Sequence, residues 1–71
     1  MNTITIQPKS TRIDEATYDY DSKELEITFK RGGKYRYPDV TREDWEDLKN
    51  AVSIGKAFNA TIRVKYTGTK I

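Results

Sequence analysis

The side chains that most often carry out catalysis are missing from this chain of 71 residues. It has no histidine and no cysteine, so the commonest general base, the thiolate nucleophile and the usual zinc ligands are absent. Carboxylates, serines and lysines remain, and no acidic cluster has the spacing of a calcium-binding loop. Gly55-Lys56 lacks the upstream glycine of a phosphate-binding loop and is followed by Ala57. We therefore expect no enzymatic activity, no metal site and no cofactor.

Basic and aromatic residues alternate in one short stretch, Lys34-Tyr35-Arg36-Tyr37, directly after the pair Gly32-Gly33. Such a stretch suits nucleic acid, because the cations can contact phosphates while an exposed ring stacks on a base. A small sheet needs the same aromatic residues to fill its core. The sequence therefore offers a binding interpretation and a purely structural one.

The net charge is only +2, but the charges are sorted into blocks along the chain. Residues 14–26 and 39–47 are mainly acidic, whereas residues 27–37 and 48–71 contain bases and no acid. If the two basic blocks meet in the fold, they form one basic surface. The alternative is that opposite blocks pair across the sheet as solvated ion pairs, each of little energy. The binding hypothesis assigns contacts with a nucleic acid or another partner to Lys34, Arg36, Lys56, Arg63 and Lys65.

The alternation of apolar and polar residues predicts three strands in an antiparallel meander with one wet face. The predicted strands are residues 16–20, 24–30 and 34–37. Residues 21–23 supply a turn between the first two. Pro38 ends the third strand, because proline cannot donate a hydrogen bond to a neighbouring strand.

The length of the hairpin loop decides which face the two tyrosines take. With a two-residue glycine turn, Phe29 lies opposite Arg36, and Tyr35 and Tyr37 are exposed. With residues 31–33 as a three-residue loop and Gly33 in a left-handed conformation, Phe29 faces Tyr35 and both tyrosines join the core. We favour the second register, because the first leaves Arg36 opposite Phe29 on the buried face.

A helix is predicted to start after Thr41, which is placed as its N-cap, with Asp44 at the capping-box position. Trp45, Leu48 and Val52 form an apolar stripe that can cover the sheet. Gly55 is placed to end this helix as a left-handed C-cap.

The segment that follows is ambiguous. Phe58, Ile62 and Tyr66 are spaced by four, as on a helix, but residues 60–66 also alternate and are rich in β-branched side chains. We favour a helical turn at residues 56–59 and then an extended segment, which would add a fourth, C-terminal strand. In either conformation Phe58 and Ile62 are expected to point inward.

The predicted fold is therefore a small α+β domain. A three-stranded meander is covered on one face by one main helix and a short helical turn, over residues 10–66. Residues 1–9 and 67–71 are expected to be a flexible segment and a tail. No apolar run approaches membrane-spanning length and no cysteine is present, so we expect a cytoplasmic protein without membrane contact.

A set of residues spread over about 10–66 resembles a known family. The set comprises Tyr18-Asp19, Leu25, Ile27, Phe29, Gly33, Tyr35, Tyr37, Ala51, Ser53, Gly55-Lys56, Phe58-Asn59, Ile62 and Arg63. Together they resemble the KTSC domain, the carboxy-terminal module of some lysyl-tRNA synthetases, which also occurs alone in small bacterial and phage proteins. Trp45 and Thr41 stand where that family often has tyrosine and proline.

The resemblance implies a binding module whose partner is RNA, through the attachment to a synthetase, although DNA would meet the same basic surface. The alternative is a module that binds a host protein, as an adaptor or a phage-type inhibitor of a larger enzyme. Six motif residues are expected to be mainly structural: Tyr35, Tyr37, Ser53, Gly55, Phe58 and Asn59. The sequence leaves the oligomeric state open.

Overall fold

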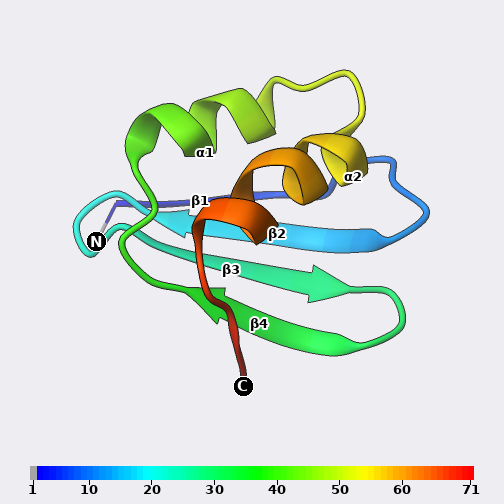
Figure 1. Cartoon of the computed structure of the whole chain (residues 1–71), viewed down its shortest axis with the longest axis horizontal. Helices are drawn as coiled ribbons and strands as arrows, with labels where there is room; N and C mark the ends of the chain where they lie inside the picture. Colours follow the sequence, from blue (N-terminus) through cyan, green and yellow to red (C-terminus); the bar gives the residue numbers. More distant parts are fainter. Residues whose placement is uncertain (1) are drawn as a thin grey trace.

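The computed structural model describes residues 2–71 of the chain. Within them, five antiparallel strands form one sheet, and helical segments cover one of its faces (Figure 1). The strands lie in the sheet in the order of the sequence: β1 (Thr3–Ile6), β2 (Ile13–Asp19), β3 (Glu24–Phe29), β4 (Gly33–Tyr37) and β5 (Thr69–Lys70). The helical segments are α1 (Arg42–Lys49), α2 (Ile54–Ala57), the π-helical η1 (Phe58–Ile62) and α3 (Arg63–Lys65).

The α+β class is confirmed, but the expected three-stranded meander is wrong, because five strands pair in the sheet. β1 and β5 lie in residues 1–9 and 67–71, the two segments expected to be flexible. β1 alternates threonine and isoleucine, both good strand formers, and all four of its residues pair with β2. β5 has only two residues, too few for an alternating pattern to be recognised. The limits proposed for the domain, residues 10–66, stay a prediction.

β2 begins at Ile13, three residues before the predicted start at Ala16. Its pairing with β3 shifts between Ile13 and Glu15, which marks a β-bulge. The extra residue lets Ile13 and Ala16 both face the helices, where they are 1% and 0% exposed. Because the bulge breaks the period of two, the pattern of the sequence does not reveal where this strand begins.

The β3–β4 hairpin has neither of the two expected registers. Tyr37 pairs with Leu25, Tyr35 pairs with Ile27, and residues 30–32 form the loop. This differs from the favoured register by two residues, and a shift of two keeps every side chain on its expected face. Tyr37 is accordingly buried and Tyr35 half-buried on the covered face. Gly33 has the predicted left-handed backbone, with φ +83°.

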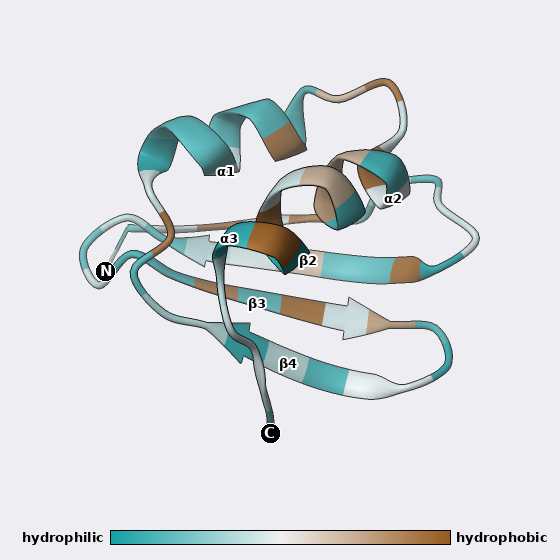
Figure 2. Ribbon diagram, viewed as in Figure 1, coloured by the Kyte–Doolittle hydropathy of each residue, from teal (hydrophilic) through white to brown (hydrophobic). Residues whose placement is uncertain are grey.

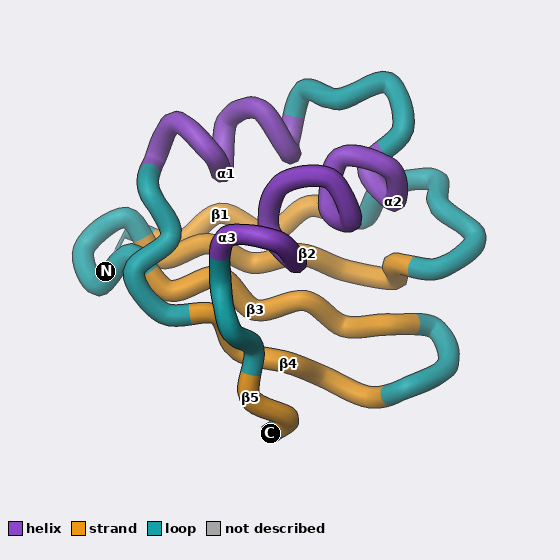
Figure 3. Tube along the Cα trace, viewed as in Figure 1, coloured by secondary structure: helices purple, strands orange, loops and turns teal. Residues whose placement is uncertain are grey.

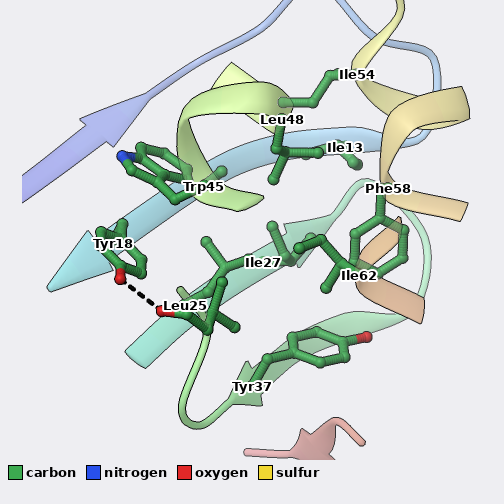
Figure 4. Close-up of a cluster of buried hydrophobic side chains, with 12 residues drawn as sticks. Ile13, Tyr18, Leu25, Ile27, Tyr37, Trp45, Leu48, Ile54, Phe58 and Ile62 are labelled. Carbon is green, nitrogen blue, oxygen red and sulfur yellow. Dashed lines mark hydrogen bonds between the residues drawn. The ribbon is translucent and has the colours of Figure 1, made fainter. Parts of the chain in front are cut away.

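The core lies between the sheet and the helical segments (Figure 4). Trp45 of α1 stacks on Tyr18 of β2, with ring centroids 5.2 Å apart and planes 12° from parallel. The Tyr18 hydroxyl donates a hydrogen bond to the carbonyl of Val40, just before α1. Figure 2 shows mainly hydrophilic residues along α1, so this helix contributes to the core through a few apolar side chains.

Helix α1 starts as predicted but ends early. The backbone N–H of Asp44 donates to Thr41 Oγ1 at 3.2 Å, so Thr41 is the N-cap. The helix stops at Lys49, and Val52, expected on its apolar stripe, is fully exposed. Gly55 does not end this helix. It lies in α2, which Ser53 caps.

The extended segment predicted after residue 59 is wrong, because residues 54–65 are helical throughout. Phe58 and Ile62 point inward as predicted, and they are 5% and 0% exposed. Burial of these two side chains, spaced by four, outweighs the strand preference of the β-branched residues around them. The segment contains one π-helical turn, in which the N–H of Arg63 bonds to the carbonyl of Phe58. Among residues 2–71, no helix has the length and apolar character that a membrane crossing requires.

A relay of hydrogen bonds ties the end of α3 to the start of α1. In a capping box the N3 side chain reaches back to the N-cap N–H. Here the Thr41 N–H donates to Tyr66 Oη at 3.2 Å, and the Tyr66 hydroxyl donates to Asp44 Oδ2 at 2.6 Å. Asp44 is only 7% exposed, and Lys65 Nζ lies 3.4 Å from its carboxylate. The Tyr66 hydrogen bond, with support from Lys65 and Thr41, lowers the pKa of Asp44 despite its burial.

The chain after α3 crosses the ring of Tyr37 at Gly68. A Cβ on Gly68 would lie 2.5 Å from two carbons of that ring, closer than any side chain tolerates. This close approach lets residues 69–70 reach the edge of β4, where Lys70 pairs with Tyr35. Glycine at this position is therefore a condition for the fifth strand.

We predict that Gly68→Ala destabilises the fold by about 1–3 kcal/mol, because the added methyl group forces the tail away from Tyr37. Gly55→Ala is the matched control. Its Cβ would meet nothing nearer than Ser10 Oγ at 3.9 Å, so helix propensity should make it neutral or stabilising by up to about 1 kcal/mol. Urea unfolding of both variants measures the difference. Equal stabilities would contradict the close contact at Gly68.

We predict that Tyr66→Phe lowers the free energy of unfolding by about 1.5–3 kcal/mol at neutral pH, because Asp44 loses its hydrogen bond. The pKa of Asp44 is lower in the folded protein, so its contribution is present above the unfolded-state value of about 3.9 and is lost as the pH falls through the folded value. The difference in stability between wild type and Tyr66→Phe should therefore narrow in acid.

Denaturant unfolding at several pH values checks this pH dependence. Tyr35→Phe serves as the control, because the Tyr35 hydroxyl makes no hydrogen bond among residues 2–71. A difference for Tyr66→Phe that stays constant as the pH falls well below the unfolded-state value of about 3.9 would show that Asp44 is not the linked group.

Candidate functional site

A groove of about 580 Å³ opens at the end of the sheet where the β3–β4 hairpin turns. The loop before β2 and the loop between β3 and β4 both lie at this end (Figure 3). They are close to residues 54–65, the continuous run of α2, η1 and α3 that we call the second helical segment. Three arginines line the groove, Arg12, Arg31 and Arg63, together with four aromatic rings. None of the described residues that line it is acidic. We call this feature the aromatic groove.

The four rings of the aromatic groove contact one another edge to face. Phe29 meets Tyr35 with ring centroids 5.6 Å apart and meets Phe58 at 5.5 Å. Phe58 in turn meets Tyr37 at 5.6 Å. Edge-to-face pairs of this kind are favourable and hold each ring in a defined orientation. Gly33 lies opposite Phe29 in the hairpin, and a Cβ there would lie 3.1 Å from Lys70 Cε.

The three arginines reach the groove from three separate segments. Arg12 precedes β2, Arg31 lies in the hairpin loop, and Arg63 begins α3. All three are exposed, and none makes an ion pair with a carboxylate among residues 2–71. Burial raises the pKa of the Tyr37 hydroxyl, and the nearby charge of Arg63 acts in the opposite direction. The groove is therefore a cationic surface with an aromatic wall.

A second hollow of about 440 Å³ adjoins the first and shares three lining residues with it, Thr11, Arg12 and Asn59. We call it the lysine hollow. Its other polar side chains are Lys9, Ser10, Ser53 and Lys56. No aromatic ring and no acid are among the described residues that line it. Lys9 and Lys56 are exposed and, like the three arginines, make no ion pair within residues 2–71.

Two of the five cations predicted from the sequence lie on the open face of the sheet. Lys34 Nζ is 3.1 Å from Glu26 Oε1, and Arg36 lies 3.7 Å from Glu24 and 3.5 Å from Glu26. The acidic block of β3 therefore pairs with the basic block of β4, as the alternative interpretation of the charges expected. These cations point away from both hollows, since they are on the face that the helices leave uncovered.

The other three predicted cations all belong to the second helical segment, but only two of them line a hollow. Lys65 lies beside Asp44 at 3.4 Å. Lys56 lines the lysine hollow, and Arg63 lines the aromatic groove. The fold thus brings only Lys56 and Arg63 to adjoining hollows, and the five cations do not gather on one surface.

Sequence reasoning missed Lys9, Arg12 and Arg31 as candidates for the site. Each stands in a loop outside any periodic pattern, so only the pairing of strands shows that these loops meet. The motif residues expected to be structural also line the two hollows. Tyr35, Tyr37, Phe58 and Asn59 line the aromatic groove, while Ser53, Gly55 and Asn59 line the lysine hollow.

The chemistry of the two hollows is that of recognition. Guanidinium, ammonium, hydroxyl and amide groups donate hydrogen bonds to anions, and aromatic faces stack on planar rings. Among residues 2–71, no group of three or more carboxylates is placed to hold a metal ion. A ligand that combines negative charge with a planar ring would match both properties of the site.

The comparisons with known proteins concern nearly the whole chain. The family model of the KTSC domain matches residues 9–66. A crystal structure of a KTSC domain protein from Yersinia pestis is 33% identical, with a TM-score of 0.91 over 99% of each chain. A lysine–tRNA ligase from Nostoc punctiforme is 34% identical over 61 residues, which are 86% of this chain but only 11% of the ligase. The chain therefore belongs to the KTSC domain family, as the resemblance of its motifs predicted.

Proposed function

We propose that this protein is a non-catalytic module that binds single-stranded RNA through the aromatic groove. One observation carries the proposal: among residues 2–71, three arginines without carboxylate partners line one groove together with four aromatic rings and no acid. Tyr37 and Phe58 are buried, so the half-buried rings of Phe29 and Tyr35 are the ones available to a base. Modules that bind single strands combine these two features, because cations track the phosphates and rings stack on the bases.

The distribution of acids supports an anionic ligand. The chain has 11 acids for 13 bases, so a random arrangement would place carboxylates near most cations. The acids pair with cations of the open face, of α1 and of α3, whereas all five cations at the two hollows are among those without partners within residues 2–71. A phosphate that entered the groove would meet attraction without repulsion from a neighbouring carboxylate.

RNA is favoured over DNA by the comparison with a tRNA ligase. The relative from Nostoc punctiforme is named as a lysine–tRNA ligase, and this chain matches 11% of its length. A small module attached to an enzyme that handles tRNA has a direct use for RNA affinity. Among the five cations proposed from the sequence, Arg63 and Lys56 keep their binding role. The proposal places Lys34, Arg36 and Lys65 outside the binding site, because carboxylates lie beside them and they line neither hollow.

A second candidate function is binding to another protein through the edge of the sheet. β1 lies at one end of the strand order and pairs with β2 only. Its residues are uncharged, and Ile4 is 40% exposed. Uncharged edges of this kind accept a strand from a partner. Thr5→Pro should abolish binding of a protein partner and leave RNA affinity unchanged if this function is correct. The reason is that proline cannot donate a backbone hydrogen bond to an added strand.

We predict that wild-type protein binds a fluorescently labelled RNA of about ten nucleotides, with affinity falling steeply between about 50 and 200 mM salt. Arg63→Gln should weaken binding and reduce the slope of log K against log salt by about 0.7 for each phosphate that the variant no longer neutralises. Tyr35→Leu should weaken binding with the salt slope unchanged, because a stacking interaction releases no counterions. Fluorescence anisotropy measures both quantities.

The matched control for Arg63→Gln is Arg36→Gln, which removes the same charge from the open face of the sheet. It should change affinity far less than Arg63→Gln does. Equal losses from the two variants would reduce the effect to net charge and rule out the groove as the binding site. A wild-type protein that binds no RNA at about 50 mM salt would refute RNA binding altogether.

A further inference from the structure

The two hollows lie side by side and differ in chemistry, and we call the pair of hollows the track. Thr11, Arg12 and Asn59 line both, so the two hollows share part of their lining. Aromatic rings line only the aromatic groove. Lysines and serines line only the lysine hollow. A ligand that lay along the track would meet stacking surfaces at one end and hydrogen-bond donors at the other.

We propose that the lysine hollow is a phosphate-binding subsite, which holds a phosphate of the nucleotide whose base occupies the aromatic groove. The proposal rests on the RNA-binding function proposed above and assigns separate parts of a nucleotide to the two hollows. Because the lysine hollow has no ring on which a base could stack, it is suited to the backbone of the ligand. Its two lysines and Arg12 supply three positive charges.

The serine hydroxyls of the lysine hollow accept hydrogen bonds from the backbone and keep a proton to donate. Ser10 Oγ accepts hydrogen bonds from the backbone N–H groups of Arg12 and Ile13, both at 3.2 Å. Ser53 Oγ accepts one from the N–H of Lys56 at 3.5 Å. An oxygen whose lone pairs accept from the backbone still has its own proton to donate. Two such protons, beside three cations, suit the acceptor oxygens of a phosphate.

The junction of the track also fits this division. Arg12 lines both hollows, so its guanidinium can reach a phosphate from the side of the base. Asn59 lines both as well, and its amide offers a donor and an acceptor to the sugar or the edge of the base. Gly55 leaves the lysine hollow open, since a Cβ there would meet only Ser10 Oγ, at 3.9 Å. The proposed subsite thus explains polar residues that the aromatic groove alone leaves unused.

The test compares adenosine with adenosine 5′-monophosphate, because the two differ only in the phosphate. Titrations of ¹⁵N-labelled protein, followed by amide chemical shifts, give both affinities and the location of each ligand. Both ligands should shift amides around Gly32 and Asn59, and only the monophosphate should shift those of Gly55 and Lys56. The wild type should bind the monophosphate several-fold more tightly, and Lys56→Gln should remove most of that preference.

Two variants serve as controls for Lys56→Gln. Lys56→Arg should keep the preference for the monophosphate, because it keeps the charge. Lys34→Gln removes a lysine that is paired with Glu26 on the open face, and it should leave the preference unchanged. Amide spectra of every variant confirm that the fold is intact before affinities are compared.

The outcomes separate this proposal from the RNA-binding function. If RNA binds and Arg63→Gln weakens it, but Lys56→Gln leaves the preference for the monophosphate intact, the phosphate subsite is wrong and the aromatic groove still stands. Shifts by the monophosphate that stay confined to the aromatic groove would have the same meaning. If neither RNA nor adenosine shifts any amide of either hollow, both proposals fail and binding to a protein through β1 takes their place.

Discussion

The register of the β3–β4 pairing, which decides which side chains face the helices, is the constraint on which the rest of the structure depends. Because side chains alternate between the two faces, one choice of face places Tyr35 and Tyr37 under the helices and Lys34 and Arg36 on the open side. Tyr37 then packs against Phe58, which positions the second helical segment. On the open side Arg36 lies directly opposite Glu26, and Lys34 reaches the same glutamate diagonally. The core, the aromatic wall and the ion pairs of the open face are thus consequences of a single alignment.

Much of this arrangement is predictable from the sequence wherever a local pattern and the burial of side chains agree. Alternation located β3 and β4, Thr41 marked the start of α1, and the spacing of Phe58 and Ile62 marked two core residues. Prediction failed where tertiary contacts override the local pattern. The bulge in β2 hides Ile13, and the two-residue β5 exists only because Gly68 passes so close to Tyr37. The candidate site was the least predictable part, because loops distant in sequence supply most of its cations.

The family motif takes on a double meaning in this light. Tyr35, Tyr37 and Phe58 are needed for packing, and the same rings line a cationic groove. A residue that is buried on one side and lines a hollow on the other is constrained twice, by stability and by recognition. One ring can therefore have a structural role and a functional role at the same time. The proposed site draws its rigidity from the core beneath it.

The π-helical turn η1 contains, in effect, one residue more than an α-helix of the same span would hold. If the same residues wound as a regular α-helix, everything after the turn would rotate by about 100° relative to α2. Arg63 would then leave the groove, and Tyr66 would lose its position between Thr41 and Asp44. The wider turn therefore sets the rotation of the helix so that a cation faces the groove at the same time as a tyrosine faces the start of α1.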